Sequence, residues 1–230
     1  MHPLATRPYT EIELHWDLPL ADSAQARARQ LRGALARAFG EDSLFHQRDA
    51  TGRQIYRYPR IHYRWHSGLG LVAGWLEAAD LLPKLPWLDL ELSLGEDRVR
   101  ITDAVISCRK AQFGVSPRLL HYRLASPALL FNQENYRRFQ GLKAGDKQQE
   151  QDRLLTAQLL TALRGMDISF PDRLYAGLID PRSRKCRYKE QELLALTGRF
   201  VCNAELPSGF AIGHAVSHGY GAIQPWEQGS

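Results

Sequence analysis

Four glycines punctuate one segment near the C-terminus, residues 206–223, at positions 209, 213, 219 and 221. Because glycine weakens strands and marks bends or close backbone approach, this segment is neither a plain strand nor a regular helix. Glycine-rich concavities present backbone N–H groups to phosphates, so the segment is a candidate anion cradle. The alternative is a glycine-punctuated turn between two core strands.

A second stretch, residues 53–66, mixes four arginines with four aromatic residues in fourteen positions. Arginine side chains attract phosphates, and aromatic rings stack on nucleic-acid bases. The mixture therefore indicates nucleic-acid binding. An exposed edge strand with alternating charge is an equally consistent interpretation.

A third stretch, residues 182–189, contains five basic residues in eight positions: Arg182, Arg184, Lys185, Arg187 and Lys189. Runs of charge are usually only solvated. Here Pro181 precedes the run, and residues 190–196, a helix candidate, follow it. This context predicts a basic hairpin.

The composition is that of an ordinary globular protein of one large or two small domains, with 230 residues, 44% hydrophobic and 24% charged. No apolar run approaches the roughly 20 residues of a membrane span, and residues 1–7 show no apolar signal core. Three cysteines, far apart and odd in number, favour neither a disulfide framework nor a zinc site and fit a reducing cytoplasm. The net charge of +5 permits a polyanionic partner.

Periodicity predicts the elements of the first half. Residues 9–18 alternate as a half-buried strand, and a helix capped by Asp22 or Ser23 follows, with its arginines mostly on solvated faces. After it we expect a loop over 41–50, a strand running into a helix over 69–82, a hairpin over 88–101, a strand over 104–108 and a polar break at 114–117.

The second half repeats this pattern loosely. It predicts a strand over 121–124, a short helix over 132–139, a polar loop over 143–150, a helix over 149–164, and strands over 174–179 and 198–204. Strand–helix–strands occurring twice indicates an α+β protein of two tandem ferredoxin-like domains, residues 1–115 and 116–230, the second carrying the glycine-rich loop.

Three segments together resemble the CRISPR repeat-processing endoribonucleases of the Cas-six family, in the RAMP superfamily. The first comprises Leu31-Arg32-Gly33-Ala34 with Phe39, Phe45-His46 and residues 58–63. The second is residues 126–136, and the third runs from Tyr188-Lys189 through 198–203 to the glycine-rich segment. Their common order and spacing cover most of the chain.

The resemblance implies metal-independent cleavage of CRISPR precursor RNA within each repeat, by two ferredoxin-like domains lying side by side. It implies a product that stays bound, often inside a larger effector complex. The partners are then precursor and mature CRISPR RNA and other effector subunits, with no membrane. Two positions depart from the family pattern: Ala211 stands where the first loop glycine is usual, and His218 where Arg or Lys is common, so its RNA contact is expected to depend on pH.

In the family, a histidine in or just after the first helix often serves as general acid or base, and His46 is the position that fits. Attack by an RNA 2′-hydroxyl needs proton transfers, which histidine suits, and positive charge near the phosphoryl oxygens. Tyr56 or Tyr58 and an arginine, Arg60 or one of the first helix, are the candidate helpers. The alternative for His46 is a loop histidine packed beside a phenylalanine.

RNA binding is assigned to other residues. A repeat stem in A-form presents phosphates and 2′-hydroxyls, so residues 182–189 and the strand arginines Arg57, Arg60 and Arg64 are expected to clamp it. Backbone positioning is assigned to the glycine-rich segment, through Gly213, His214, His218, Gly219 and Gly221.

His214 and His218 could instead be catalytic or be buried partners of carbonyl groups. No histidine has a metal-ligand spacing with a cysteine or carboxylate, so neither a metal nor another cofactor is predicted. Two other functions are consistent with the sequence: a catalytically weak RNA-binding subunit of the same fold, and a two-domain α+β protein that binds a small anion.

Overall fold

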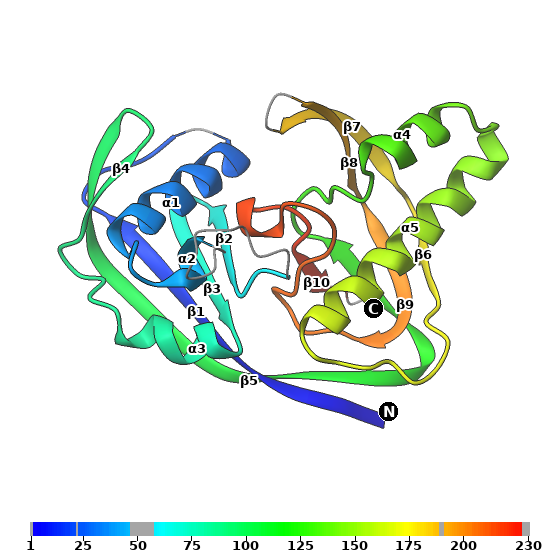
Figure 1. Ribbon diagram of the computed structural model, residues 1–230, viewed down its shortest axis with the longest axis horizontal. Coiled ribbons are helices and arrows are strands. Elements are labelled where there is room, and N and C mark those ends of the chain that lie inside the picture. Colours follow the sequence, from blue (N-terminus) through cyan, green and yellow to red (C-terminus); the bar gives the residue numbers. More distant parts are fainter. Residues whose placement is uncertain (1, 22, 47–57, 189–190, 227–230) are drawn as a thin grey trace. The chain divides into compact units, whose positions relative to one another are not determined.

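The structure is a computed structural model that describes residues 2–21, 23–46, 58–188 and 191–226 (Figure 1). The chain divides into two compact units. The N-terminal unit comprises Arg7–Ala111 and Ser217–Gly219, and the C-terminal unit comprises Met1–Thr6, Gln112–Val216 and Tyr220–Ser230. Each unit combines an antiparallel sheet with helices, so the predicted α+β class is confirmed.

The N-terminal unit contains β1 (His2–Trp16), α1 (Ala24–Ala38), α2 (Ser43–His46), β2 (Ile61–His66), β3 (Leu69–Trp75), α3 (Glu77–Leu81), the 3-10 turn η1 (Leu82–Lys84), β4 (Glu91–Leu94) and the first part of β5 (Asp97–Leu124). Its strands lie in the order β2-β3-β1-β5, and β4 pairs with β5. The pairs β1–β3 and β2–β3 are antiparallel.

The core of this unit lies between the sheet and α1, which crosses β1 to β3 (Figure 1). Ile12 and Leu14 of β1 are buried in the same cluster as Leu31 and Leu35 of α1. Strand alternation and the helical period therefore direct two apolar sets at each other. Ser23 caps α1, since its Oγ accepts a hydrogen bond from a backbone N–H of the first turn at 3.2 Å.

The C-terminal unit contains the rest of β5, α4 (Gln133–Gln140), α5 (Ala144–Gly165), β6 (Ala176–Leu178), β7 (Arg182–Tyr188), β8 (Gln191–Thr197), β9 (Arg199–Glu205), the start of the 3-10 turn η2 (Val216–His218) and β10 (Ile223–Pro225). The strand order is β10-β5-β9-β6, antiparallel throughout. β7 and β8 form a separate hairpin. Leu155 and Leu159 of α5 are buried on the side of β6.

Several predicted elements are confirmed. β3 runs into α3, and β4 and β5 form the expected hairpin around a turn in which Gly95 has φ +69°. The helix predicted over 132–139 is α4, capped by Asn132, whose Oδ1 accepts the Asn135 N–H at 2.8 Å. These are the elements whose periodicity and cap residues agree with each other.

Arg27 of α1 does not lie on a solvated face. The residue is 5% exposed, donates to the carbonyl oxygens of Ala21 at 2.7 Å and Leu94 at 3.1 Å, and pairs with Asp97 at 2.8 Å. An arginine with this many internal acceptors can be buried because each N–H finds a partner. Its role is to hold α1 to the β4–β5 hairpin.

The polar break predicted at residues 114–117 is wrong, because β5 continues through it. The pairing of β5 with β9 shifts register between Val115 and Leu120. Pro117 lies inside this irregularity, where the missing N–H of proline interrupts no ladder hydrogen bond. The domain boundary predicted at residue 115 therefore falls within a strand.

Two further element predictions are wrong. Residues 144–150, expected as a polar loop, form the first turns of α5; they are mostly exposed, and a solvated helix end has no apolar periodicity to reveal it. The helix candidate over 190–196 is instead strand β8, which pairs with β7. A short apolar run such as residues 193–196 fits a helix or a strand equally, and the partner strand decides.

No helix in the described part of the chain is long and apolar enough to cross a membrane.

Candidate nucleic-acid interface

His46, the predicted catalytic histidine, is the last residue of the short helix α2, which forms where a loop was expected. Asp42 caps this helix by accepting a backbone N–H of its first turn at 2.9 Å. Phe45 is buried, with its ring centroid 5.2 Å from that of Phe39. Burial of Phe45 therefore fixes α2 in the core and leaves His46 half-buried, with its imidazole within reach of solvent.

The imidazole of His46 lies over Gly40, just after α1. A Cβ at Gly40 would stand 3.3 Å from His46 Nε2, closer than most real contacts of a Cβ. A side chain at this position would push the ring away. The glycine thus helps to set where the imidazole lies, a contribution that the sequence pattern did not reveal.

The predicted helpers Tyr58 and Arg60 lie just before β2. The Tyr58 ring meets the His62 ring edge-on at 5.3 Å between centroids. Arg60 Nε donates to Glu77 Oε1 of α3 at 3.2 Å. The Arg60 side chain is 10% exposed and the Glu77 side chain 45%, so only the carboxylate end of this ion pair is at the surface.

Arg64 of β2, predicted to bind RNA, already has internal partners. Its Nη2 pairs with the Glu11 carboxylate and donates to the Tyr9 hydroxyl at 3.1 Å. The Tyr9 hydroxyl in turn donates to Glu11 at 2.6 Å, and burial raises the pKa of Tyr9 to about 12. Phosphate binding by Arg64 would leave Glu11 without its cation in a half-buried site, so Arg64 serves the sheet. Only the strand register, absent from the sequence, brings Glu11 to Arg64.

His62 is buried in the sheet, 1% exposed, and its Nε2 lies 3.0 Å from the Pro59 carbonyl oxygen. Burial, and then the nearby Arg64 cation, lower the pKa of His62 to about 3. The ring is therefore neutral near pH 7 and offers no positive charge to a phosphate. His62 belongs to the packing of the N-terminal unit.

The basic hairpin predicted around residues 182–189 is confirmed as the β7–β8 pair. Arg182, Arg184 and Lys185 of β7 are exposed, whereas residues 193–196 of β8 are buried. The buried residues of β8 anchor the hairpin, and the exposed cations of β7 lie at its surface. This arrangement presents cations along one strand without using the core.

Three of the predicted site residues, Tyr56, Arg57 and Lys189, lie outside the described residues, as does the side chain of Arg187. Arg187 itself is in β7, opposite Glu192 of β8.

The glycine-rich segment is held by backbone contacts. A Cβ at Gly221, where φ is +72°, would lie 1.8 Å from the Ile212 carbonyl oxygen, and a Cβ at Gly213, where φ is +90°, would lie 2.6 Å from that of Leu129. The N–H groups of Ile212 and His214 donate to the carbonyls of Gly221 and Leu129 at 2.9 and 2.8 Å. These glycines serve close backbone crossings.

The N–H of Gly221 is likewise bonded, to the Pro127 carbonyl at 2.9 Å, so the anion-cradle interpretation does not hold at Ile212, His214 or Gly221. A donor that already has an acceptor is not presented to a phosphate. His214 has an exposed side chain, but nearby protein atoms partly desolvate its ring, and this desolvation lowers its pKa. The segment is closer to the alternative, a glycine-punctuated turn, than to a cradle.

Ser217–Gly219, assigned to the second domain from sequence, belongs to the N-terminal unit. Gly219 has φ +85°, and its Cβ would lie 2.7 Å from the Cβ of Ala28 and 3.3 Å from the Tyr63 carbonyl oxygen. Here glycine allows the chain to touch α1 and β2. His218 is half-buried, with Nδ1 3.3 Å from Ser217 Oγ. The histidines His46 and His218 are thus parts of the same unit.

Two family models match the chain, the Cas6b N-terminal domain over residues 9–112 and the Cas6b C-terminal domain over residues 114–226. Together they account for nearly the whole sequence. The chain belongs to the Cas6b family. The family resemblance seen in the sequence is confirmed.

Solved structures share the Cas6b fold. One described as Cas6b is 21% identical, with a TM-score of 0.87 over 96% of this chain and all of that chain (100%). Another, described as the CRISPR RNA processing endoribonuclease Cas6b, is 18% identical, with a TM-score of 0.74 and the same coverage, 96% and 100%. An uncharacterized protein of Methanocaldococcus jannaschii is 26% identical over 133 residues, 58% of this chain and 90% of the relative.

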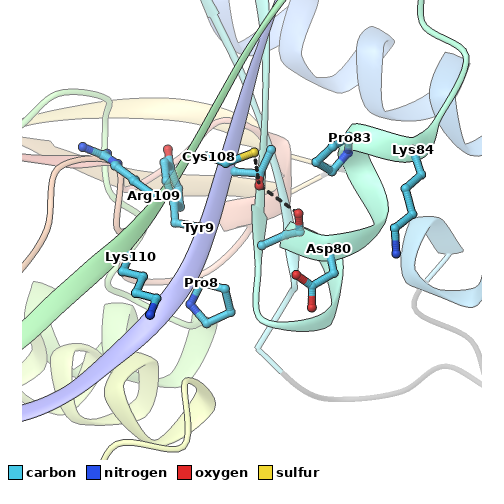
Figure 2. A pocket seen from close by; sticks show the side chains of 10 residues that line it. Pro8, Tyr9, Asp80, Pro83, Lys84, Cys108, Arg109 and Lys110 are labelled. Carbon is cyan, nitrogen blue, oxygen red and sulfur yellow. Dashed lines mark hydrogen bonds between the residues drawn. The ribbon is translucent and has the colours of Figure 1, made fainter.

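This Cas6b-family chain also has a groove that the sequence did not reveal, beside the N-terminal half of β1 (Figure 2). It measures about 700 Å³ and is lined by α3, η1 and β5 as well. Lys110 and Lys84 stand on opposite walls with Asp80 between them, and Thr10 lies 3.4 Å from Cys108 Sγ. Arg109 also lines the groove, and none of the site residues predicted from the sequence lies in it.

Within residues 2–21, 23–46, 58–188 and 191–226, no three His, Cys, Asp or Glu side chains gather as a metal site requires.

Proposed function

We propose that this Cas6b-family protein is a metal-independent endoribonuclease that binds CRISPR precursor RNA, cleaves it within its repeats and retains the product. The observation that carries the proposal is the match of both Cas6b domains along residues 9–226. The fold shared with a structure described as a CRISPR RNA processing endoribonuclease supports it.

We infer that both units are ferredoxin-like. In the N-terminal unit the order β-α-β-β-α-β, with strands arranged β5-β1-β3-β2, supports this inference. The C-terminal arrangement β10-β5-β9-β6 is the same, with the glycine-rich segment occupying the place of the second helix between β9 and β10. Two such sheets offer rigid elements on which a cleavage site can be held.

The proposed reaction is attack by a ribose 2′-hydroxyl on the adjacent phosphorus. The 2′-oxygen–phosphorus bond forms, the bond from phosphorus to the 5′-oxygen breaks, and the proton leaves the attacking oxygen and reaches the departing one. The products are a 2′,3′-cyclic phosphate and a 5′-hydroxyl. His46 is assigned as the general base or acid, a role that contributes roughly 10²–10⁴-fold in rate.

Arg60 is the arginine we assign beside His46. Its Nε pairs with the exposed carboxylate of Glu77, and exchange of that carboxylate for a phosphoryl oxygen would let the guanidinium stabilise the developing charge. Tyr58 is the described tyrosine that remains a candidate helper. The location of His218 in the same unit as His46 supports it as the alternative proton donor.

RNA binding is assigned to the exposed side chains of β7: Arg182, Arg184 and Lys185. An A-form stem exposes phosphates and 2′-hydroxyls, which a row of cations on a strand can follow. Product retention follows if these contacts are made to the stem rather than to the scissile phosphate, because the stem survives cleavage. The retained product could then be passed to other effector subunits.

The test is cleavage of a labelled repeat RNA in excess EDTA, with the product ends identified. We expect 2′,3′-cyclic phosphate ends from the native protein and a rate at least 10²-fold lower for His46→Ala. His66→Ala, which removes an exposed histidine of β2, is the matched control and should cleave normally.

Each outcome separates the hypotheses. Undiminished cleavage by His46→Ala removes His46 from the mechanism, and loss in His218→Ala would then move the proton transfer there. Tight binding without cleavage by the native protein would favour the catalytically weak RNA-binding subunit. If the native protein neither binds nor cleaves the repeat RNA, the remaining hypothesis is a protein that binds a small anion.

A further inference from the structure

A notch lies between α1 and the β4–β5 turn, on the N-terminal unit, and none of the site residues assigned above lines it. It measures about 450 Å³ and is lined by Ala26, Arg29, Gln30, Gly33, Arg37, Ser93 and Gly95. We propose that this α1 notch binds backbone phosphates of the RNA at a place separate from cleavage. The inference rests on the proposed function, since that function supplies the RNA.

The notch carries positive charge with no carboxylate in its lining. Arg29 and Arg37 are both exposed and lie on one face of α1, about 12 Å apart along the helix axis. The turn carries two carboxylates: Asp97 is paired with Arg27 at 2.8 Å, and the exposed Glu96 is not among the residues that line the notch. The lining therefore favours a polyanion over a neutral or cationic ligand.

The amide of Gln30 is oriented as a donor toward the notch. Its Oε1 accepts a hydrogen bond from Arg27 Nη1 at 3.0 Å, and Arg27 is itself buried and held by backbone carbonyls. Gln30 Nε2 therefore points to the other side, where it lies 2.6 Å from the position of a Cβ at Gly95. Glycine at position 95 leaves space for this NH₂ group, which adds a neutral donor to the lining of the notch.

Arg37 is also held in place. Its Nη2 donates to the Ser93 carbonyl oxygen of β4 at 3.2 Å, so the guanidinium reaches across the notch. A guanidinium has five N–H donors in a planar fork, and the donors that this bond does not use can pair with phosphate oxygens. Holding the side chain beforehand lowers the entropy lost on binding.

Gly33 leaves the floor of the notch open. It lies within α1, where glycine costs about 1 kcal/mol relative to alanine. A Cβ there would meet only Arg37 Nη1, at an ordinary contact distance of 3.7 Å, so packing does not require glycine. The missing side chain leaves open space between Arg29 and Arg37, in which the RNA backbone could lie and bring one phosphate to each guanidinium.

The experiment measures binding of a long repeat RNA by filter retention between 50 and 200 mM salt. Arg29→Ala with Arg37→Ala should weaken binding about tenfold and reduce the slope of log affinity against log salt by roughly 1.4–1.8, for two lost phosphate contacts. Gly33→Leu should weaken binding similarly without removing charge. Since leucine is the better helix former, its thermal stability should equal or exceed that of the native protein.

The matched control removes two exposed helix arginines of the other unit, Arg137→Ala with Arg164→Ala, and should leave the slope unchanged. Cleavage of saturating RNA should be unchanged in all variants. Suppose that the native protein cleaves the RNA. If the notch variants then bind RNA as tightly as the native protein, or if the control pair loses as much affinity as they do, only the notch proposal is refuted. If the native protein neither binds nor cleaves repeat RNA, the notch and the proposed function are both overturned.

Discussion

Gly219 provides a sharp test of how the glycine-rich segment reaches the N-terminal unit. At φ +85°, a Cβ on Gly219 would lie 2.7 Å from the Cβ of Ala28. A left-handed backbone costs an L-residue roughly 1–2 kcal/mol. Two methyl carbons prefer about 3.5–4.0 Å, so an overlap of about 1 Å adds the overpacking cost of about 1–3 kcal/mol. Gly219→Ala should therefore destabilise the fold by about 2–5 kcal/mol.

The same unit contains a matched control. Gly68 has φ +83°, and a Cβ there would have nothing within 4 Å. Gly68→Ala should therefore cost only the backbone part, about 1–2 kcal/mol. Because the two φ angles agree, the difference between the variants measures the close contact of Gly219 with α1.

A rescue variant isolates that contact further. Ala28→Gly removes the methyl group that the new Cβ would strike, at a cost of about 1 kcal/mol for glycine within a helix. In the Gly219→Ala background the same change should restore part of the lost stability. The coupling energy of the double-mutant cycle should be about 1–3 kcal/mol.

Urea unfolding of the native protein, the three single variants and the double variant, followed by circular dichroism, provides these free energies. Equal destabilisation by Gly219→Ala and Gly68→Ala, or a coupling energy near zero, would refute the close approach to α1. Because His218 precedes Gly219, the cleavage assay on the same proteins shows whether moving this segment also changes the chemistry.

Three further predictions follow from the site. The triple variant Arg184→Ala, Lys185→Ala and Arg187→Ala should weaken binding of a repeat stem and reduce the slope of log affinity against log salt by roughly 2–3. An unchanged slope would mean that this basic strand is only solvated. Because burial lowers the folded-state pKa of His62 to about 3, its contribution to stability is complete above about pH 6.5 and is lost as the pH falls toward 3. Between pH 7 and pH 4, the urea midpoint of His62→Gln should fall less than that of the native protein. An equal fall in the two proteins would contradict this. Gly221→Ala places a Cβ 1.8 Å from a carbonyl oxygen and should lose more than about 4 kcal/mol, seen as loss of folded protein on expression; a normal yield would disprove the backbone crossing.

The local sequence pattern was sufficient to identify an element when that element buries a single face. The alternation around Ile12 and the helical period around Leu31 each identify an element and the face that it buries. The predicted cap Ser23 placed the start of α1 correctly. These signals are local, because capping and amphipathic periodicity depend on residues within a turn or two of one another.

The sequence pattern gave wrong predictions where the structure of a segment depends on a partner from elsewhere in the chain. The apolar run of β8 becomes a strand because β7 pairs with it, and α5 begins earlier than its apolar face does. The assignment of Arg64 to RNA failed to anticipate Glu11, because the two are brought together by strands that are far apart in the sequence. Charge pairing across a sheet depends on register, which a single sequence does not contain.

The sequence by itself determined the α+β class, the family, and the residue types that nucleic-acid chemistry needs: a histidine after the first helix, a basic hairpin and a glycine-rich segment near the end. Only the tertiary structure decided which of their donors and charges the fold itself already uses. It assigned the backbone N–H groups of Ile212, His214 and Gly221 to internal carbonyls and placed Ser217–Gly219 against α1. It also divided the arginines into those held by carboxylates inside the fold and those left at the surface. The physical reason is that a donor or a charge can act on a ligand only if the fold has not already satisfied it.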